Sequence, residues 1–465
     1  MLTFNTIFYG WGAQLIFQQP IPLLAAANTE EGYDKAIVGA LVITAAIIFI
    51  FSIILGEICT RFGLPSVLAD LTTGVLLGAS VLGLLIFSQS GVEANSLLIK
   101  FLEFTTGTSS TVAQEAYKFQ MEEYIDESAN IGLLALLFTT GLESNLRDLI
   151  RVGSQAATVA VTGVVVPFSL GTLVLIKIFG VATIPAVFAG AALTATSIGI
   201  TAKVLKDIGR LQSDEGQIII GAAILDDILG IVVLAVVLSL VKTGEVEIIN
   251  IVYLIASAIA FVLVAVVLNR LFGSLFVSII DRLSNPAALM LLAIIFLNTF
   301  ALSASAIGLE AILGAFAAGL VLGETKFQEK LEQLFRPFVY VYTTIFFVTI
   351  GAKVDLSVIN PAIPENRQGL IIAACLIAIA IFGKVIAGFA AISKEPINRL
   401  AIGFGMIPRG EVGLVFAGLG AASGVLSNSL DAAIIIMVIV TTLVAPLLLR
   451  IVFSENSTLK TQESE

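Results

Sequence analysis

The sequence contains no histidine and only two cysteines among its 465 residues. Histidine is the side chain that most often titrates near neutral pH and binds metals, so any proton chemistry must use carboxylates, lysine or water. Cys59 and Cys375 lie inside apolar runs, so we expect neither a disulfide framework nor a cysteine metal site. The sequence offers no nucleophile constellation, metal-ligand cluster or phosphate-cradling loop, and we therefore expect neither an enzyme nor a cofactor.

Charged side chains are also scarce. They make up 12% of the chain, against 58% hydrophobic residues, and the mean hydropathy is +1.05. This composition is far too apolar for a soluble globular protein of this length, which predicts an integral membrane protein. The apolar runs suit spanning helices of about 20 residues rather than barrel strands of about 10 residues. The predicted fold class is therefore an all-α polytopic membrane protein, whose first partner is the lipid bilayer.

Loops and the polar tail "SENSTLKTQESE" supply most of the net charge of −10. We interpret the tail as a solvated end rather than a binding tract, and we expect no nucleic-acid partner. No basic stretch precedes the apolar part of the first 30 or so residues, so a cleaved signal peptide is not expected.

Thirteen membrane-spanning helices are predicted from the apolar runs. Lysine and arginine number fifteen in the loops after odd-numbered helices and seven on the opposite side. The positive-inside rule then places the N-terminus outside, or in a lumen, and the C-terminus in the cytoplasm. The predicted spans are residues 36–59, 64–87, 129–147, 154–180, 183–205, 216–241, 248–269, 286–306, 309–323, 334–353, 368–392, 397–421 and 430–453.

Two glycine-rich segments have similar spacing. "GLPSVLADLTTGVLLG" at 63–78 and "GLEAILGAFAAGLVLG" at 308–323 belong to the second and ninth predicted helices. An offset of seven helices reverses the crossing direction, so the two copies form an inverted-topology repeat, as in many secondary transporters. Glycine and leucine recur in any membrane helix, so this similarity alone leaves the plainer explanation open.

Two predicted helices with the same offset contain strong interruptions. The fifth includes "GAALTATSIGITAK" at 190–203, and the twelfth includes "GFGMIPRGEVGLVFAGLG" at 403–420. Pro408 removes a backbone donor and clashes with the preceding turn, so a break is expected there. Freed backbone groups are tolerated in a membrane only beside protein or a cavity. Two broken helices in corresponding positions predict an ion site between them at the midplane.

The most unusual run is "GQIIIGAAILDDILGIVVLAVVLSL" at 216–240, because Asp226 and Asp227 lie side by side within it. A charge at the bilayer centre costs about 2.5–3.5 kcal/mol, so both acids must face protein or water. Lys384 lies near the centre of another apolar run, where snorkelling to an interface is difficult. We therefore expect an ion pair between Lys384 and either Asp226 or Asp227.

Arg409 and Glu411 also fall inside an apolar run, next to Pro408. Their expected role is structural. Each stabilises the helix break by pairing with the other or with the partner helix. Five further acids lie near predicted helix ends and are expected to be mostly solvated or funnel-lining: Glu57, Asp70, Glu143, Glu310 and Glu324. The acidic segment at about 88–128 is expected to be a solvated loop outside the membrane or in a lumen, where its charge could also gather cations.

These motifs resemble the monovalent cation/proton antiporter superfamily in its second, electrogenic, paired-aspartate branch, which includes bacterial-type sodium/proton antiporters. "GAAILDDILGIVVL" resembles the paired-aspartate helix, and "TATSIGITAKVLKDIGRLQSDEGQ" and "PRGEVGLVFAGLG" resemble the two broken helices. The resemblance extends over residues 36 to 453 in the family's order. It implies a homodimer with a dimer domain, a mobile core and a linking helix. The implied parts are an N-terminal extracytoplasmic segment (1–35), the dimer domain (36–147 and 286–353), the core (154–241 and 368–453), the linker helix (248–269) and a cytoplasmic tail (454–465).

The resemblance also implies roles for individual residues. Asp227 is similar to the main cation and proton carrier, Asp226 to the second acid and Lys384 to its partner. Thr196 and Ser197 resemble the polar pair that lends oxygens at the first break. Lysine at position 384 matches the electrogenic members, whereas arginine there would resemble the electroneutral branch. Some potassium-exporting relatives have a cytoplasmic nucleotide-binding domain, and such regulation is not expected here.

The predicted function is electrogenic exchange of sodium, or a similar monovalent cation, for protons, with alternating access and competition for Asp227 and Asp226. No residue in the sequence excludes a potassium/proton exchanger on the same fold. A cation channel is a second alternative, although an open pore does not need inverted broken helices or a buried lysine. A non-transporting scaffold would leave the charges within the membrane unexplained.

Overall fold

The computed structural model describes residues 27–62, 64–87, 96–144, 146–243, 256, 272–282, 287–307, 309–354, 364–393, 396–409 and 425–462. These residues fold almost entirely into helices, and none of them forms a strand beyond one isolated bridge. The helices are α1 (Ala27–Arg61), α2 (Ser66–Leu77), α3 (Ser96–Thr106), α4 (Ser110–Phe119), the π-helix η2 (Gln120–Ile125), α5 (Asp126–Glu143), α6 (Leu146–Arg151), α7 (Gly153–Lys177), α8 (Thr183–Ala192), α9 (Ile198–Asp207), α10 (Asp214–Thr243), α12 (Ala288–Ala306), α13 (Ala311–Gly323), α14 (Gln328–Ala352), α15 (Pro364–Phe389), α16 (Arg399–Gly405) and α18 (Asn428–Gln462).

Six helices within the described residues are long and apolar enough to cross a membrane, and shorter apolar helices accompany them. The all-α, multi-pass membrane fold is therefore confirmed, while the number of thirteen spans stays a prediction. The six are Gly32–Arg61, Gly153–Lys177, Ala288–Ala306, Gln328–Ala352, Arg367–Phe389 and Ser429–Phe453.

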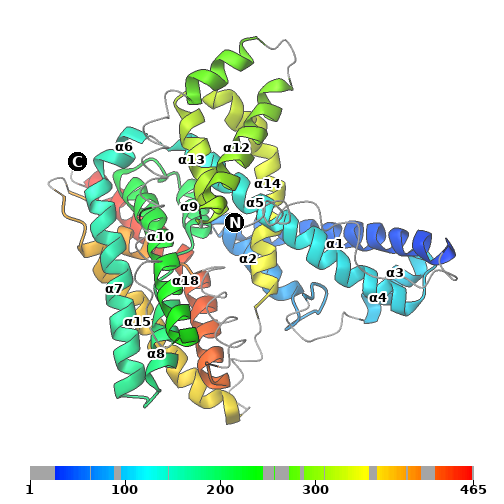
Figure 1. Ribbon diagram of the computed structural model, residues 1–465, viewed down its shortest axis with the longest axis horizontal. Coiled ribbons are helices and arrows are strands. Elements are labelled where there is room, and N and C mark those ends of the chain that lie inside the picture. Colours follow the sequence, from blue (N-terminus) through cyan, green and yellow to red (C-terminus); the bar gives the residue numbers. More distant parts are fainter. Residues whose placement is uncertain are drawn as a thin grey trace.

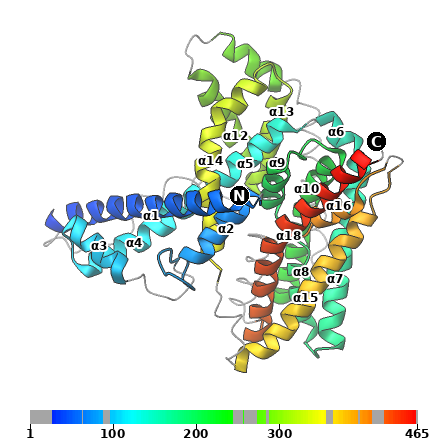
Figure 2. The ribbon, with the colours of Figure 1, turned by 180° about the vertical axis from the view of Figure 1, so that it is seen from behind.

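The helices form two bundles, which Figures 1 and 2 show from opposite sides. In the first bundle, α5 packs against α13 and α14, α14 against α2, α12 against α13, and α1 against α2, α3 and α4. In the second bundle, α15 packs against α7, α16 and α18, while α10 packs against α7 and α8. The two bundles meet where α9 contacts α2 and α5, and where α18 contacts α2.

Helix pairs within the first bundle repeat at the offset found in the sequence. α2 packs against α14, and α13 packs against α5. In the predicted numbering these are the second helix with the tenth and the ninth helix with the third, so a shift of seven converts one pair into the other. The pairs α1–α2 and α12–α13 are related in the same way. This packing agrees with an inverted repeat and favours it over a chance recurrence of glycine and leucine.

Glycines of α5 and α13 allow the backbones of these two helices to touch. A Cβ atom at Gly319 of α13 would lie 2.0 Å from the carbonyl oxygen of Phe138 in α5, and one at Gly141 would lie 2.2 Å from that of Phe316. Hydrocarbon offers little driving force for helix association, so close backbone packing must supply it. The glycine spacing therefore determines where α5 and α13 cross.

The second predicted span is shorter than expected. The prediction of one helix over 64–87 is wrong, because α2 ends at Leu77 and the chain turns back, with the backbone nitrogens of Leu84 and Leu85 donating to Leu77 O at 2.9 and 2.8 Å. Gly83 in this turn has φ +60°, a conformation that glycine adopts readily. An apolar run does not reveal such a turn when its polar content stays low.

The acidic segment at 88–128 is not a plain loop. Within its described part, α3, α4 and η2 are helical, and α3 and α4 pack against α1. Ala113, Ala116 and Tyr117 form the buried face of α4. The Tyr117 hydroxyl donates to Leu84 O at 2.7 Å and accepts from the backbone nitrogen of Ile86 at 3.0 Å. Four acids of this segment are exposed: Glu115, Glu122, Glu123 and Glu127. The helices here carry a polar face, so they do not stand out as apolar runs in the sequence.

Several predicted boundaries shift at the ends of the chain. α1 begins at Ala27, before the predicted 36, and α18 continues to Gln462, into the predicted tail 454–465. The sequence after 453 contains no glycine or proline that would stop a helix. The predicted linker helix 248–269 lies outside the described residues except for residue 256.

Candidate functional site

Both interrupted segments are broken in the structure as far as it describes them. α8 ends at Ala192 and α9 begins at Ile198, and every residue between them is buried. α16 ends at Gly405 and residues 406–409 continue without helical structure. Threonine and serine at the first break favour local hydrogen bonds over helix, and Pro408 cannot continue a helix. Glu411, predicted at the second break, lies outside the described residues.

The two breaks are joined by direct hydrogen bonds. The backbone nitrogen of Ser197 donates to Pro408 O at 2.8 Å. The Thr196 hydroxyl donates to Met406 O at 3.1 Å. The Thr201 hydroxyl donates to Gly405 O at 2.8 Å. Two hydroxyls and one backbone nitrogen of the first broken helix therefore satisfy carbonyls released by the second, as required away from water.

The paired acids of α10 lie inside the second bundle. Asp226 has no exposed surface and Asp227 is 4% exposed. Lys384 of α15 is also fully buried, which excludes snorkelling. Its ammonium lies 3.2 Å from Asp226 Oδ2 and donates to Thr194 O at 2.8 Å. The structure thus brings the lysine to Asp226 and to a carbonyl of the first break.

Arg409 provides a second buried cation. Its Nη1 donates to Ala195 O, and its own carbonyl accepts from the Thr442 hydroxyl of α18. Among the described residues, Nε and Nη2 of this guanidinium have no hydrogen-bond partner. Arg409 therefore connects the second break to the first break and, through its carbonyl, to α18.

The backbone carbonyls that accept hydrogen bonds from Lys384 and Arg409 were not predicted from the sequence. Thr194 O accepts from Lys384 and Ala195 O accepts from Arg409. Two consecutive residues of the first break thus each bind one protein cation. A backbone atom has no residue-type signature, so the only available signal was the predicted break itself.

Two oxygens at this crossing have spare acceptor capacity. Asp226 Oδ1 and Ser197 Oγ are buried and have no hydrogen-bond partner among the described residues. Carboxylate and hydroxyl oxygens are the ligands that small hard cations prefer. The oxygens of this crossing therefore suit a small cation. One of them belongs to a carboxylate, which can bind a proton in place of the cation.

Polar contacts join the two bundles beside the first break. Lys206 Nζ donates to Glu143 of α5, and the Ser66 hydroxyl of α2 donates to Asp207 Oδ2 at 2.7 Å. Asp70, expected near a helix end, is 8% exposed inside α2. This edge of the bundle interface is therefore rich in charge, while Glu57 at the end of α1 is exposed.

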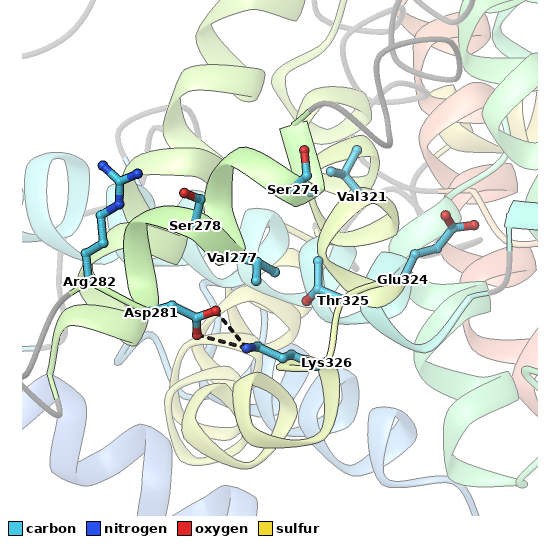
Figure 3. A pocket seen from close by; sticks show the side chains of 10 residues that line it. Ser274, Val277, Ser278, Asp281, Arg282, Val321, Glu324, Thr325 and Lys326 are labelled. Atoms are coloured by element: carbon cyan, nitrogen blue, oxygen red, sulfur yellow. Dashed lines mark hydrogen bonds and ion pairs between the residues drawn. The ribbon is translucent and has the colours of Figure 1, made fainter.

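A separate cavity of about 700 Å³ lies between residues 272–282 and the C-terminal end of α13 (Figure 3). Asp281 binds Lys326 there, with both carboxylate oxygens within 2.9 Å of the ammonium. None of the lining residues belongs to the crossing of the broken helices, so this cavity is not the candidate site.

Comparison with known proteins agrees with this architecture. The chain is 54% identical over 434 residues to the high-affinity Na(+)/H(+) antiporter NhaS3 of Synechocystis, covering 93% of this chain and 94% of that protein. It is 29% identical over 415 residues to the Na(+)/H(+)-K(+) antiporter GerN of Bacillus cereus, covering 88% and 95%. Its fold resembles that of the sodium proton antiporter MjNhaP1 of Methanocaldococcus jannaschii, with a TM-score of 0.57 at 16% identity over 89% and 95% of the two chains. The model of the transmembrane sodium/hydrogen exchanger family matches residues 45–455, so the chain belongs to this family.

Proposed function

We propose that this protein exchanges sodium for protons across a membrane, electrogenically and by alternating access. The observation that supports this most directly is the meeting of Asp226, Asp227 and Lys384, all buried, beside two broken helices. The name of the Synechocystis relative, a Na(+)/H(+) antiporter at 54% identity, favours sodium over potassium as the cation.

The exchange follows from competition for carboxylate oxygens. A carboxyl group in a low-dielectric interior either binds a proton and becomes neutral, or stays charged next to a cation. Asp227 is the carrier in this proposal, Asp226 is the second acid, and Thr196 and Ser197 lend oxygens at the first break. A site that crosses only with protons or with a cation produces exchange rather than leak. In this proposal the protonation state of Lys384 also changes when its ion pair with Asp226 forms or breaks. More positive charge therefore moves as protons than returns as sodium.

The two bundles provide the moving parts. The second bundle contains the crossing and acts as the mobile core, while the first bundle acts as the scaffold and as the contact surface of a homodimer. The positive-inside bias favours an N-terminus outside, or in a lumen, and a cytoplasmic C-terminus. Rigid movement of one bundle against the other would then expose the site to each side in turn.

The test uses purified protein in proteoliposomes that contain a pH-sensitive dye. Asp227→Asn is expected to abolish sodium-driven proton movement, and Glu57→Gln, which changes an exposed acid at the end of α1, is the matched control. Sodium, lithium and potassium gradients are applied separately, and potassium-driven exchange at the sodium rate would favour the potassium alternative. Normal exchange by Asp227→Asn would overturn the carrier assignment. Exchange that does not respond to an imposed membrane potential would overturn electrogenicity.

A further inference from the structure

The ammonium of Lys384 is held on two sides and faces helix α7 on a third. Its two acceptors within the described chain are Thr194 O at 2.8 Å and Asp226 Oδ2 at 3.2 Å. An ammonium has three donors. A Cβ atom at Gly163 of α7 would lie only 3.2 Å from Lys384 Nζ and 3.5 Å from its Cδ. The missing side chain at Gly163 therefore leaves the space that the ammonium occupies.

Pro167 follows Gly163 by one helical turn inside α7. A proline has no backbone N–H, so the carbonyl four residues earlier loses its usual helical hydrogen bond. That carbonyl belongs to Gly163, the residue that faces the ammonium. Both residues are buried, so the Gly163 carbonyl is removed from bulk solvent.

Pro167 also contacts α15 next to Lys384 and so helps to set the position of the lysine along α7. A Cβ atom at Gly383, the residue before Lys384, would lie 2.7 Å from Cγ of Pro167. α7 and α15 are therefore in close contact at the level of the proline ring. The Gly163 carbonyl and the space that the ammonium occupies lie at the same level of α7, because the glycine and the proline are one helical turn apart.

We propose that Gly163 and Pro167 form a seat for Lys384 and act as positioning residues for the exchange. The Gly163 carbonyl accepts no hydrogen bond from the ammonium in this structure, and in this proposal it is the acceptor to which the ammonium turns when it leaves Asp226. When a cation engages Asp226, the lysine then retains two backbone acceptors instead of one and is not left as a poorly solvated buried charge. This inference rests on the proposed function, because it assigns the seat to the lysine of that same site.

Two variants separate the space from the carbonyl. Gly163→Ala puts a methyl group against the ammonium, and Pro167→Ala returns an N–H to the Gly163 carbonyl. Each is expected to slow saturating exchange in proteoliposomes about tenfold, the effect of losing one hydrogen bond to a charged group. Gly153→Ala is the control on the same helix, since no atom lies within 4 Å of its Cβ.

Thermal stability in detergent distinguishes this role from simple packing. Replacing a proline inside a helix favours the helix, so Pro167→Ala is expected to slow exchange while its melting temperature stays equal or rises. A Pro167→Ala protein with wild-type exchange would overturn the proposal. Slower exchange together with a lower melting temperature would indicate a packing role and would also overturn it.

A double-mutant cycle ties the effect to the lysine and does not depend on transport. The sodium-dependent rise in melting temperature is measured for wild type, Gly163→Ala, Lys384→Ala and the double variant. Gly163→Ala is expected to change this rise when Lys384 is present and to leave it unchanged in the Lys384→Ala background. Equal effects in both backgrounds would overturn the seat. Failure of the proposed function would appear separately, as normal exchange by Asp227→Asn.

Discussion

The buried pair of Lys384 and Asp226 leads to a quantitative prediction about stability. Both side chains have no exposed surface, and their charged atoms are 3.2 Å apart. Removing one partner of a buried pair costs about 3–5 kcal/mol, because the other charge stays buried without compensation. Lys384→Met and Asp226→Asn are each expected to lose stability in this range. The double variant buries no unpaired charge, so its loss is expected to be about 1–3 kcal/mol smaller than the sum of the single losses.

The free energy of unfolding of the four proteins is measured by titration with a denaturing detergent in mixed micelles. The pair of Lys353 and Asp126, 2.6 Å apart with side chains 28% and 41% exposed, serves as the matched control. An exposed pair contributes only about 0.2–1 kcal/mol, so its cycle is expected to give a coupling below about 1 kcal/mol. Additive losses at Lys384 and Asp226, or a Lys384→Met protein as stable as wild type, would refute the reasoning.

Two further predictions concern packing and movement. Gly319→Ala is expected to lower the melting temperature and the yield of folded protein, since overpacking costs about 1–3 kcal/mol and its Cβ would lie 2.0 Å from Phe138 O; Gly56→Ala, with no atom within 4 Å, should behave as wild type in the same melting assay. Ser66→Ala removes the 2.7 Å hydrogen bond to Asp207 between the bundles. The populations of spin-label distances between α2 and α9 are expected to shift by about two- to fivefold. Unchanged distance distributions would count against a role for this contact in holding the bundles together.

The fold was largely predictable where the sequence interrupts its own apolar pattern. Glycine spacing in the second and ninth helices indicated the repeat, and threonine, serine and proline indicated both breaks. The turn after Leu77 and the helices α3 and α4 were not predictable in the same way. The turn lies within an apolar run. The short helices are amphipathic and pack against α1, so they do not stand out as apolar runs in the sequence.

The candidate site was predictable to the extent that it consists of charges. A buried lysine and a buried acid must find partners in a membrane, so Lys384 was expected to lie beside the adjacent Asp226 and Asp227 although it is far from them in the chain. Residue types alone left open which aspartate faces the lysine. The carbonyls of Thr194 and Ala195 were beyond prediction, because their availability follows from the path of the backbone at the break.

Those two carbonyls explain how the crossing remains stable between transport steps. Breaking a helix inside a membrane releases backbone acceptors, and burying a lysine or an arginine leaves donors in need of partners. Lys384 binds Thr194 O and Arg409 binds Ala195 O, so each deficit offsets the other. An exchanger must pass through states in which its cargo has left, and carbonyls that relied on the cargo would then be unsatisfied. Because the protein supplies its own tethered cations, these two carbonyls stay satisfied without the cargo, and in the proposed exchange the carboxylate and hydroxyl oxygens bind the ion that moves.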